Sequence, residues 1–392
     1  MRLTVCAFVI THILTIFATE ILFMRIVKQA FSFLFPSTRT SSYSTVLISN
    51  PVLRVLANHQ FKTLATVFIF FLLTSCSDKE KCAFIPDTKD ITISYSFEEL
   101  QDSLPAITSK QQLVDFFSRH TTLRDFVFAR ESYPNDSVFI NELYARFSNP
   151  HLDTLLLETK RVFGDLNELQ SEFNQAFVNL KYYYPDFQPP KIQTIITGLE
   201  TDLFVTDTLI VVGLDYYLGK GAKYRPNMYE YMLQRYEKSF IVPSVMLLYG
   251  IDPRLNETDL QDKTVLAEMI TYGKAYYFAK HMLPCVADSV FIGYSAEEMA
   301  GARANQDVIW KKLVEDEVFY STSGRIRQKY ISERPKTFDV ADQAPGRIGT
   351  WVGWQIVNAY AKRKADVTLQ ELMLNKNARQ IFDESRYRPV EP

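Results

Sequence analysis

The residues best suited to metal or nucleophilic chemistry are few and widely spaced. The chain contains five histidines, and His120, His151 and His281 are those that follow residue 76. None of the three stands in HExxH or in another spacing that would bring two imidazoles onto one metal ion. The four cysteines include no CxxC pair. We therefore expect no metal ion and no cofactor, and we expect each histidine to be structural or exposed.

Acidic residues offer a second route to catalysis, because paired carboxylates can act as general acid and general base. The candidates are Glu200 with Asp202, Asp215, and the pair Glu297 and Glu298. Asp215 follows a β-branched run and precedes two tyrosines, which suits a ligand contact, although a turn or cap is the commoner use of such a residue. The Glu297–Glu298 pair fits the first turn of a helix, where negative charge is favoured.

The segment richest in unusual residues is Pro345-Gly-Arg-Ile-Gly-Thr-Trp-Val-Gly-Trp354. On a helix, Gly349 and Gly353 would form a smooth strip that another backbone could approach, and tight core packing is the alternative role of this segment. Arg347 falls in the first turn, where cations are disfavoured, so we expect it to meet a carboxylate of this domain or of a partner. Over the whole chain, the candidate contacts with a partner or ligand are Asp202, Asp215, Arg347, Trp351 and Trp354.

Cys76 stands at the end of a signal-peptide pattern. Arg54 and Lys62 precede the eleven-residue apolar run Thr63–Leu73, and Thr74-Ser75-Cys76 follows at once. A positive n-region, a short apolar h-region and small residues at a cleavage site are typical of a signal peptide. Its end resembles the lipobox of bacterial lipoproteins, in which the cysteine is lipidated and becomes the new N-terminus. A membrane-spanning anchor is the alternative, but eleven residues are too few to cross the hydrocarbon core.

This pattern divides the chain into four segments. We expect a lipoprotein signal peptide at residues 54–75, a lipidated tether at 76–90 and a globular domain at 91–392. Residues 1–53 form an upstream extension, and it is uncertain from the sequence whether they are translated. No methionine lies between Met24 and Cys76 that could start the signal peptide. We expect an alternative start codon there, and an additional membrane segment is the weaker option.

The charge distribution restricts the partners. The first 75 residues carry six basic residues and one acidic residue, and the remaining 37 basic and 44 acidic residues give a net charge near −7. This argues against a nucleic-acid partner, because phosphate binding needs a concentrated basic face. Ser77 rather than Asp after the lipidated cysteine favours transport to an outer membrane. We therefore expect a protein of the cell envelope, held by acyl chains such as palmitate, facing the periplasm and binding other envelope proteins.

Hydrophobic periodicity predicts an α+β, mostly helical single domain with a small β-sheet. The β-branched runs 191–198 and 207–214 suggest neighbouring strands joined by a turn around Thr206. In the oxidising envelope Cys82 and Cys285 could pair or remain two thiols. The expected helical segments are 91–186 in several pieces, 262–281, 295–314, 346–364 and 368–382.

Several different short motifs follow one another along the expected domain. They are Val211–Gly219, Phe240–Pro243, Met269–Lys274, Gly293–Tyr294, Ile309–Trp310, Pro345–Gly349 and Trp351–Ile356. Together they resemble the GldB family of gliding-motility lipoproteins over nearly all of residues 76–392. The resemblance implies an envelope lipoprotein needed for surface gliding in bacteria that glide, and related non-gliding bacteria also carry members. It implies no catalytic residues.

The order strand, strand, long helix is also similar to that of predicted zinc proteases whose helix would hold HExxH. The corresponding residues here, Met269–Lys274, include no histidine, so such kinship would mean a zincin-like scaffold without its metal site.

The function we favour is a non-enzymatic, lipid-anchored envelope protein that supports gliding motility or associated export machinery through protein–protein interaction. The alternative is an envelope hydrolase, either a degenerate metalloprotease-like enzyme or a carboxylate-based one. An open polar cleft would favour the enzyme, and a closed site filled by tyrosine and tryptophan would favour the binding protein. The carboxylates considered for the enzyme are Asp202, Asp215 and Glu298, and the side chains considered for the closed site are Tyr216, Tyr272 and Trp354.

Overall fold

The computed structural model describes residue 82 and residues 84–389. The upstream extension 1–53, the signal peptide 54–75, the lipidation site Cys76 and the tether as far as residue 81 lie outside the described residues. Within the described part of the chain, no helix is long and apolar enough to cross a membrane.

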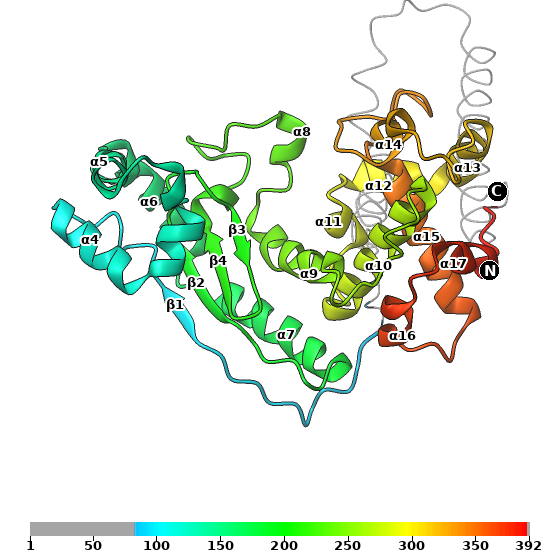
Figure 1. Ribbon diagram of the computed structural model, residues 1–392, viewed down its shortest axis with the longest axis horizontal. Helices are drawn as coiled ribbons and strands as arrows, with labels where there is room; N and C mark the ends of the chain where they lie inside the picture. The colour runs from blue at the N-terminus through cyan, green and yellow to red at the C-terminus, as the bar shows by residue number, and fades with distance from the viewer. Residues whose placement is uncertain (1–81, 83, 390–392) are drawn as a thin grey trace, which may run out of the picture. The chain divides into compact units, whose positions relative to one another are not determined.

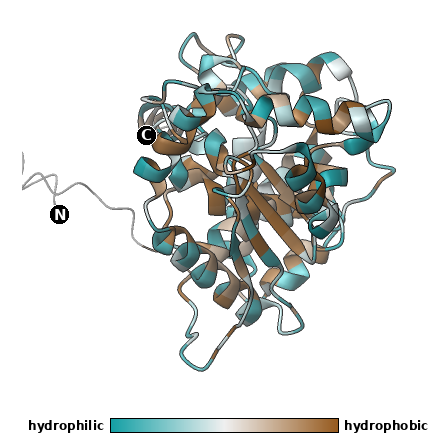
Figure 2. Ribbon diagram, turned by 90° about the vertical axis from the view of Figure 1, so that its left-hand side faces the viewer, coloured by the Kyte–Doolittle hydropathy of each residue, from teal (hydrophilic) through white to brown (hydrophobic). Residues whose placement is uncertain are grey.

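A four-stranded mixed sheet lies between two groups of helices. Its strands, in spatial order, are β1 (Phe97–Glu99), β2 (Lys191–Ile195), β4 (Leu209–Gly213) and β3 (Leu203–Val205). β1, β2 and β4 are parallel, and β3 is antiparallel to β4. β2 and β4 are both buried nearly throughout, because helices cover the two faces of the sheet, and β4 is also apolar along its length. Brown arrows inside a shell of mixed helices mark the apolar strand residues in Figure 2.

The helices make up most of the fold (Figure 1). Along the chain they are α4 (Lys110–Arg119), α5 (Asp136–Phe147), α6 (His151–Phe163), α7 (Asn167–Tyr183), α8 (Glu230–Leu233), α9 (Ile241–Ile251), α10 (Val265–Met282), α11 (Asp288–Ile292), α12 (Ala296–Ala304), α13 (Gln306–Glu315), α14 (Gly324–Tyr330), α15 (Ile348–Arg363), α16 (Leu369–Leu374) and α17 (Ala378–Ser385). The mostly helical α+β class predicted from the sequence is confirmed.

Alternation along β4 divides the core in two. Val211 packs with α4, α5 and α6 in the smaller cluster. Ile210 and Val212 point to the other face, into a larger cluster with α7, α9, α10 and α15. Period-two alternation thus allows one short strand to serve two cores, and the larger core is the one that carries the candidate site.

Some predicted connections and helix limits were wrong. The turn at Thr206 joins β3 to β4, whereas β2 and β4 are parallel neighbours, and parallel strands need a longer crossover than a tight turn. The segment 295–314 is two helices, because Asn305 ends α12 with a side-chain bond of 2.8 Å to Gly301 O. The segment 368–382 also splits, because Asn377 caps a new helix, α17, through Gln380 N at 2.9 Å. Asparagine competes for backbone groups in this way.

Candidate interaction site

Four segments distant in the sequence meet around the carboxylate of Glu333. Glu333 Oε2 lies 2.9 Å from Arg235 Nη2 and 3.5 Å from Arg347 Nε. The surrounding residues, which we call the Glu333 site, are Tyr231, Gln234, Arg235, Gly293, Tyr294, Glu298, Glu333, Arg334, Pro335, Lys336, Pro345, Gly346 and Arg347. Arg347 thus has the intradomain carboxylate partner that its place at a helix start demanded.

Two glycines make this convergence sterically feasible. A Cβ on Gly346 would lie 1.8 Å from Arg334 O, and one on Gly293 would lie 2.3 Å from Arg235 Cδ. Gly293 also has φ +71°, which favours glycine. Tyr294 OH donates to Gly346 O at 2.7 Å and joins the two glycine segments. The Gly293–Tyr294 and Pro345–Gly349 motifs are therefore the backbone supports of the Glu333 site.

Arg347 is positioned by its own backbone and by the start of α15. Its φ is +56°, and Arg347 O accepts a bond of 2.9 Å from Thr350 Oγ1. The guanidinium donates to Ile292 O as well as approaching Glu333. Burial opposes the charge, but the surrounding Tyr276, Glu333 and tyrosine hydroxyls together raise the pKa of Arg347. Arg347 is therefore a fixed, largely buried cation.

A groove of about 650 Å³ opens along α10 next to the Glu333 site and shares Glu333 and Arg347 with it. Its lining residues are Ile251, Thr258, Asp259, Leu260, Asp262, Lys263, Ala267, Glu268, Thr271, Tyr272, Tyr276, Arg327, Ile331, Ser332, Glu333, Arg347 and Thr350. We call it the α10 groove. Its mixture of aliphatic, aromatic and charged groups resembles the lining of a recognition surface.

Each carboxylate that lines the α10 groove already has a partner. Glu268 pairs with Arg327, and Glu333 pairs with its two arginines. Asp259 Oδ1 and Asp262 Oδ1 accept backbone N–H groups from the turns that follow them, at 2.9 and 3.0 Å. The lining residues thus provide no unpartnered carboxylate for acid–base catalysis.

The floor of the groove depends on a close crossing of α10 and α15. A Cβ on Gly353 would lie 1.9 Å from Met269 O, and one on Gly273 would lie 2.4 Å from Gly353 O. Gly353 thus meets Met269 O and Gly349 meets Tyr330 O within the domain, which is the tight core packing given as the alternative role of this segment. Trp351 and Trp354 are buried in the larger core, and the Trp354 ring packs 5.2 Å from the Tyr276 ring. These tryptophans support the site from beneath.

Asp202 and Asp215 belong to a separate cluster at the end of β4. Asp215 is fully buried and accepts backbone bonds from Thr197 N at 3.0 Å and Leu199 N at 2.6 Å. Burial raises the pKa of Asp215 despite these bonds. Asp202 is half-buried and accepts a bond of 3.1 Å from Tyr236 OH. Asp215 therefore holds the loop that follows β2, and Asp202 is the more accessible of the two.

The residues considered for the enzyme and for the closed site do not gather at one place. Glu298 closes the capping box of α12 and pairs with Lys336 at 2.8 Å, away from the aspartate cluster. Tyr272 lines the α10 groove, Trp354 is buried, and the Tyr216 ring packs 5.6 Å from Tyr236. The groove is open and polar, which is the shape expected for the enzyme, and the three carboxylates named for that hypothesis lie outside its lining.

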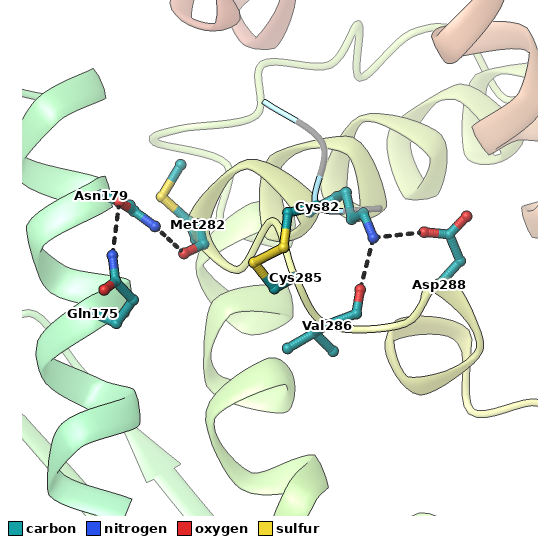
Figure 3. The surroundings of a disulfide bond; sticks show 8 residues. Cys82, Gln175, Asn179, Met282, Cys285, Val286 and Asp288 are labelled. Atoms are coloured by element: carbon teal, nitrogen blue, oxygen red, sulfur yellow. Dashed lines mark hydrogen bonds and ion pairs between the residues drawn. A yellow bond between two sulfur atoms is a disulfide. The ribbon is translucent and has the colours of Figure 1, made fainter. Parts of the chain in front are cut away.

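The histidines and cysteines that the structure describes are not among the residues that line the α10 groove. Among residues 82 and 84–389, no group of three or more His, Cys, Asp or Glu side chains is placed to hold a metal ion. His281 is buried at the end of α10, and His151 Nδ1 lies 3.0 Å from Tyr224 OH. Cys82 and Cys285 form a disulfide beside the last turn of α10 (Figure 3), which resolves the alternative left open by the sequence.

Lys274, in the Met269–Lys274 motif, has a structural role that the sequence did not reveal. Its Nζ donates to Glu257 O at 2.7 Å and to Met373 O and Asn375 O at 3.0 Å each. Burial lowers the pKa of Lys274 to about 8, while three carbonyl acceptors favour the ammonium form. Lys274 therefore ties α10 to the end of α16.

Sequence reasoning also missed Glu333 and Arg235, the partners of Arg347. Both residues lie in polar stretches with no periodic signal, and only the fold brings them together. The available clue was Arg347 itself, since a cation at a helix start needs a nearby acceptor.

Comparison with known proteins identifies one family. The family model described as "Gliding motility protein GldB" matches residues 81–389, which include all the segments of the Glu333 site and the α10 groove. No curated protein and no solved structure matches the chain significantly. The kinship with zinc proteases stays a prediction from the sequence. By the match over residues 81–389 and the motifs that build the Glu333 site, the chain belongs to the GldB family of gliding-motility proteins.

Proposed function

We propose that this protein is a lipid-anchored component of the cell envelope that supports gliding motility, or the export machinery associated with it, by binding other envelope proteins. The observation that carries the proposal is the family match, which begins at residue 81, five residues after the lipobox cysteine Cys76. Several acyl chains on Cys76 would hold the domain at a membrane more firmly than a single acyl chain can. Ser77 supports an outer-membrane location facing the periplasm.

We propose the α10 groove and the adjoining Glu333 site as the surface that binds the partner. Family motifs from three parts of the chain converge there, and Gly293, Gly346 and Gly353 are needed for its geometry. Arg347 contributes a fixed positive charge, since two arginines surround one carboxylate. Of the other candidate contacts, Asp202 is accessible at a second surface, and the buried aspartate and tryptophans act by positioning.

The absence of unpartnered carboxylates among the groove residues supports a binding role over hydrolysis. The glycine contacts add to this support, because a surface built on fixed backbone crossings is preorganised for recognition.

Site-specific crosslinking in intact cells tests the proposal. Leu260 lines the α10 groove and is 73% exposed. Leu157 is 68% exposed and lies on α6, which belongs to the smaller core on the other side of the sheet from α10 (Figure 1). A photo-crosslinking amino acid at position 260 should form an adduct with an envelope protein, and the same amino acid at position 157 should not. Cys76→Ser should abolish the adduct with an outer-membrane partner, because the unprocessed precursor would stay at the inner membrane with its signal peptide. Equal adducts from both positions, or an adduct that survives Cys76→Ser, would contradict the proposal.

A further inference from the structure

The Cys82–Cys285 disulfide fixes the point at which the chain enters the folded region. It attaches Cys82 to the residue three positions after the end of α10, across a sequence separation of 203 residues. The neighbouring α7 packs against the same end, where Asn179 Nδ2 donates to Met282 O at 2.8 Å (Figure 3). The entry point is therefore held by two helices of the larger core.

Exposed apolar side chains gather at this entry point. Phe84 is 47% exposed, Ile85 68% and Tyr182 45%, and we call these three residues the entry patch. The Phe84 ring stacks on His281 with centroids 4.1 Å apart. Tyr183 OH donates to Phe84 O at 3.4 Å, and the Tyr182 ring packs 5.0 Å from the Tyr183 ring. The patch thus joins the start of the domain to the end of α7.

The chain between the expected lipid and the disulfide is short. Only Ser77–Lys81 separate Cys76 from Cys82, and six residue steps can span at most about 20 Å. A lipid on Cys76 lies at the bilayer surface, so Cys82, which the disulfide fixes to the domain two residues before Phe84, stays within this distance of the lipid headgroups. Without the disulfide, Cys82 would not be attached to the end of α10, and the chain between the lipid and the domain would be longer.

We infer that the entry patch is the membrane-facing surface of the domain and rests in the interfacial region of the bilayer. This inference depends on the proposed acylation of Cys76. Aromatic side chains with one polar end are favoured at the level of lipid headgroups, as Tyr182 would be. The tether itself is neutral, because Asp78 and Glu80 balance Lys79 and Lys81, so the attraction to the membrane comes from the entry patch. Because the tether is short, the bilayer is the surface that lies nearest to the entry patch.

Quenching of an added tryptophan tests which face meets the membrane. The full-length lipidated protein would be purified as Tyr182→Trp and as Leu157→Trp, then placed in vesicles whose lipids carry bromine near the headgroup end of the acyl chains. Position 157 is the matched control, because it is exposed and lies on α6 across the sheet from α7 and α10. Emission of the parent protein is subtracted to remove its three native tryptophans.

We expect the indole at position 182 to lose emission, because a ring at the interface would lie near the bromine atoms, and the indole at position 157 to lose none. In Cys82→Ala/Cys285→Ala the quenching at 182 should decrease, because the tether is no longer fixed at Cys82. Equal quenching at both positions, or none at position 182 in acylated protein, would overturn the inference, and a protein covering the patch would give the latter result. Mass spectrometry of the N-terminus separates these outcomes from a lack of acylation, which would contradict the proposed anchor as well.

Discussion

Gly353→Ala tests whether α10 and α15 pack backbone against backbone beneath the candidate site. The added Cβ would lie 1.9 Å from Met269 O, whereas a carbon and a carbonyl oxygen in contact are about 3.3 Å apart. The helices would have to separate by the difference, because neither the Cβ nor the carbonyl can rotate away. Overpacking of this kind costs about 3 kcal/mol at the upper end of its usual range, and the better helix propensity of alanine returns about 1 kcal/mol. We expect a net loss of about 2 kcal/mol in the free energy of unfolding.

Gly301→Ala is the matched control, because Gly301 also lies inside a helix but its Cβ would meet no atom within 4 Å. The same substitution should stabilise the protein there by about 0.5–1 kcal/mol. Urea unfolding followed by tryptophan fluorescence and circular dichroism would give both free energies. If Gly353→Ala were as stable as the parent protein, or more stable, the described crossing of α10 and α15 would be wrong.

Other substitutions test individual parts of the structure. Lys274→Met should lower the free energy of unfolding by about 2 kcal/mol, because Glu257 O and Asn375 O lose their ammonium donor, while Met373 O keeps a bond of 3.0 Å from Glu257 N; an unchanged value in urea unfolding would refute the tie between α10 and α16. Burial lowers the pKa of His281 from 6.5 to about 4, so His281 takes up a proton in the unfolded chain at a higher pH than in the folded protein. The free energy of unfolding should therefore fall by about 3 kcal/mol between pH 7 and pH 4 through this residue. His281→Phe should remove that part of the pH dependence, and identical pH profiles of variant and parent would count against the burial of His281. Purified protein should contain no stoichiometric zinc, and chelators should leave its melting temperature unchanged; zinc bound at one ion per chain would revive the enzyme hypothesis.

The sequence predicted the elements with strong local signals. The expected helical segment 262–281 is α10 (Val265–Met282), and the expected segment 346–364 is α15 (Ile348–Arg363). β1 (Phe97–Glu99) was missed within a segment predicted as mostly helical, although the alternation of Ile91, Ile93 and Tyr95 with polar residues leads directly up to it. The error came from weighting helical periodicity over a long window in which a short strand contributes few residues.

The candidate site was only partly predictable, because its residues come together through long-range packing. Arg347 and the glycine strip carry local signals, since a cation at a helix start and glycines within a helix both need a reason. Glu333 and Arg235 carry none. The burial of Trp351 and Trp354 depends on which face of α15 meets α10, and that is decided by the glycine contacts of both helices.

Acylation of Cys76 is the most direct test of the central claim that this GldB-family protein is a lipid-anchored envelope protein. Cells fed an alkyne fatty acid would express the parent protein, Cys76→Ser, and Cys6→Ser as the matched control for an upstream cysteine. We predict label on the parent and on Cys6→Ser, and an unlabelled, unprocessed precursor for Cys76→Ser. Label on the Cys76→Ser protein, or no label on the parent, would contradict the account.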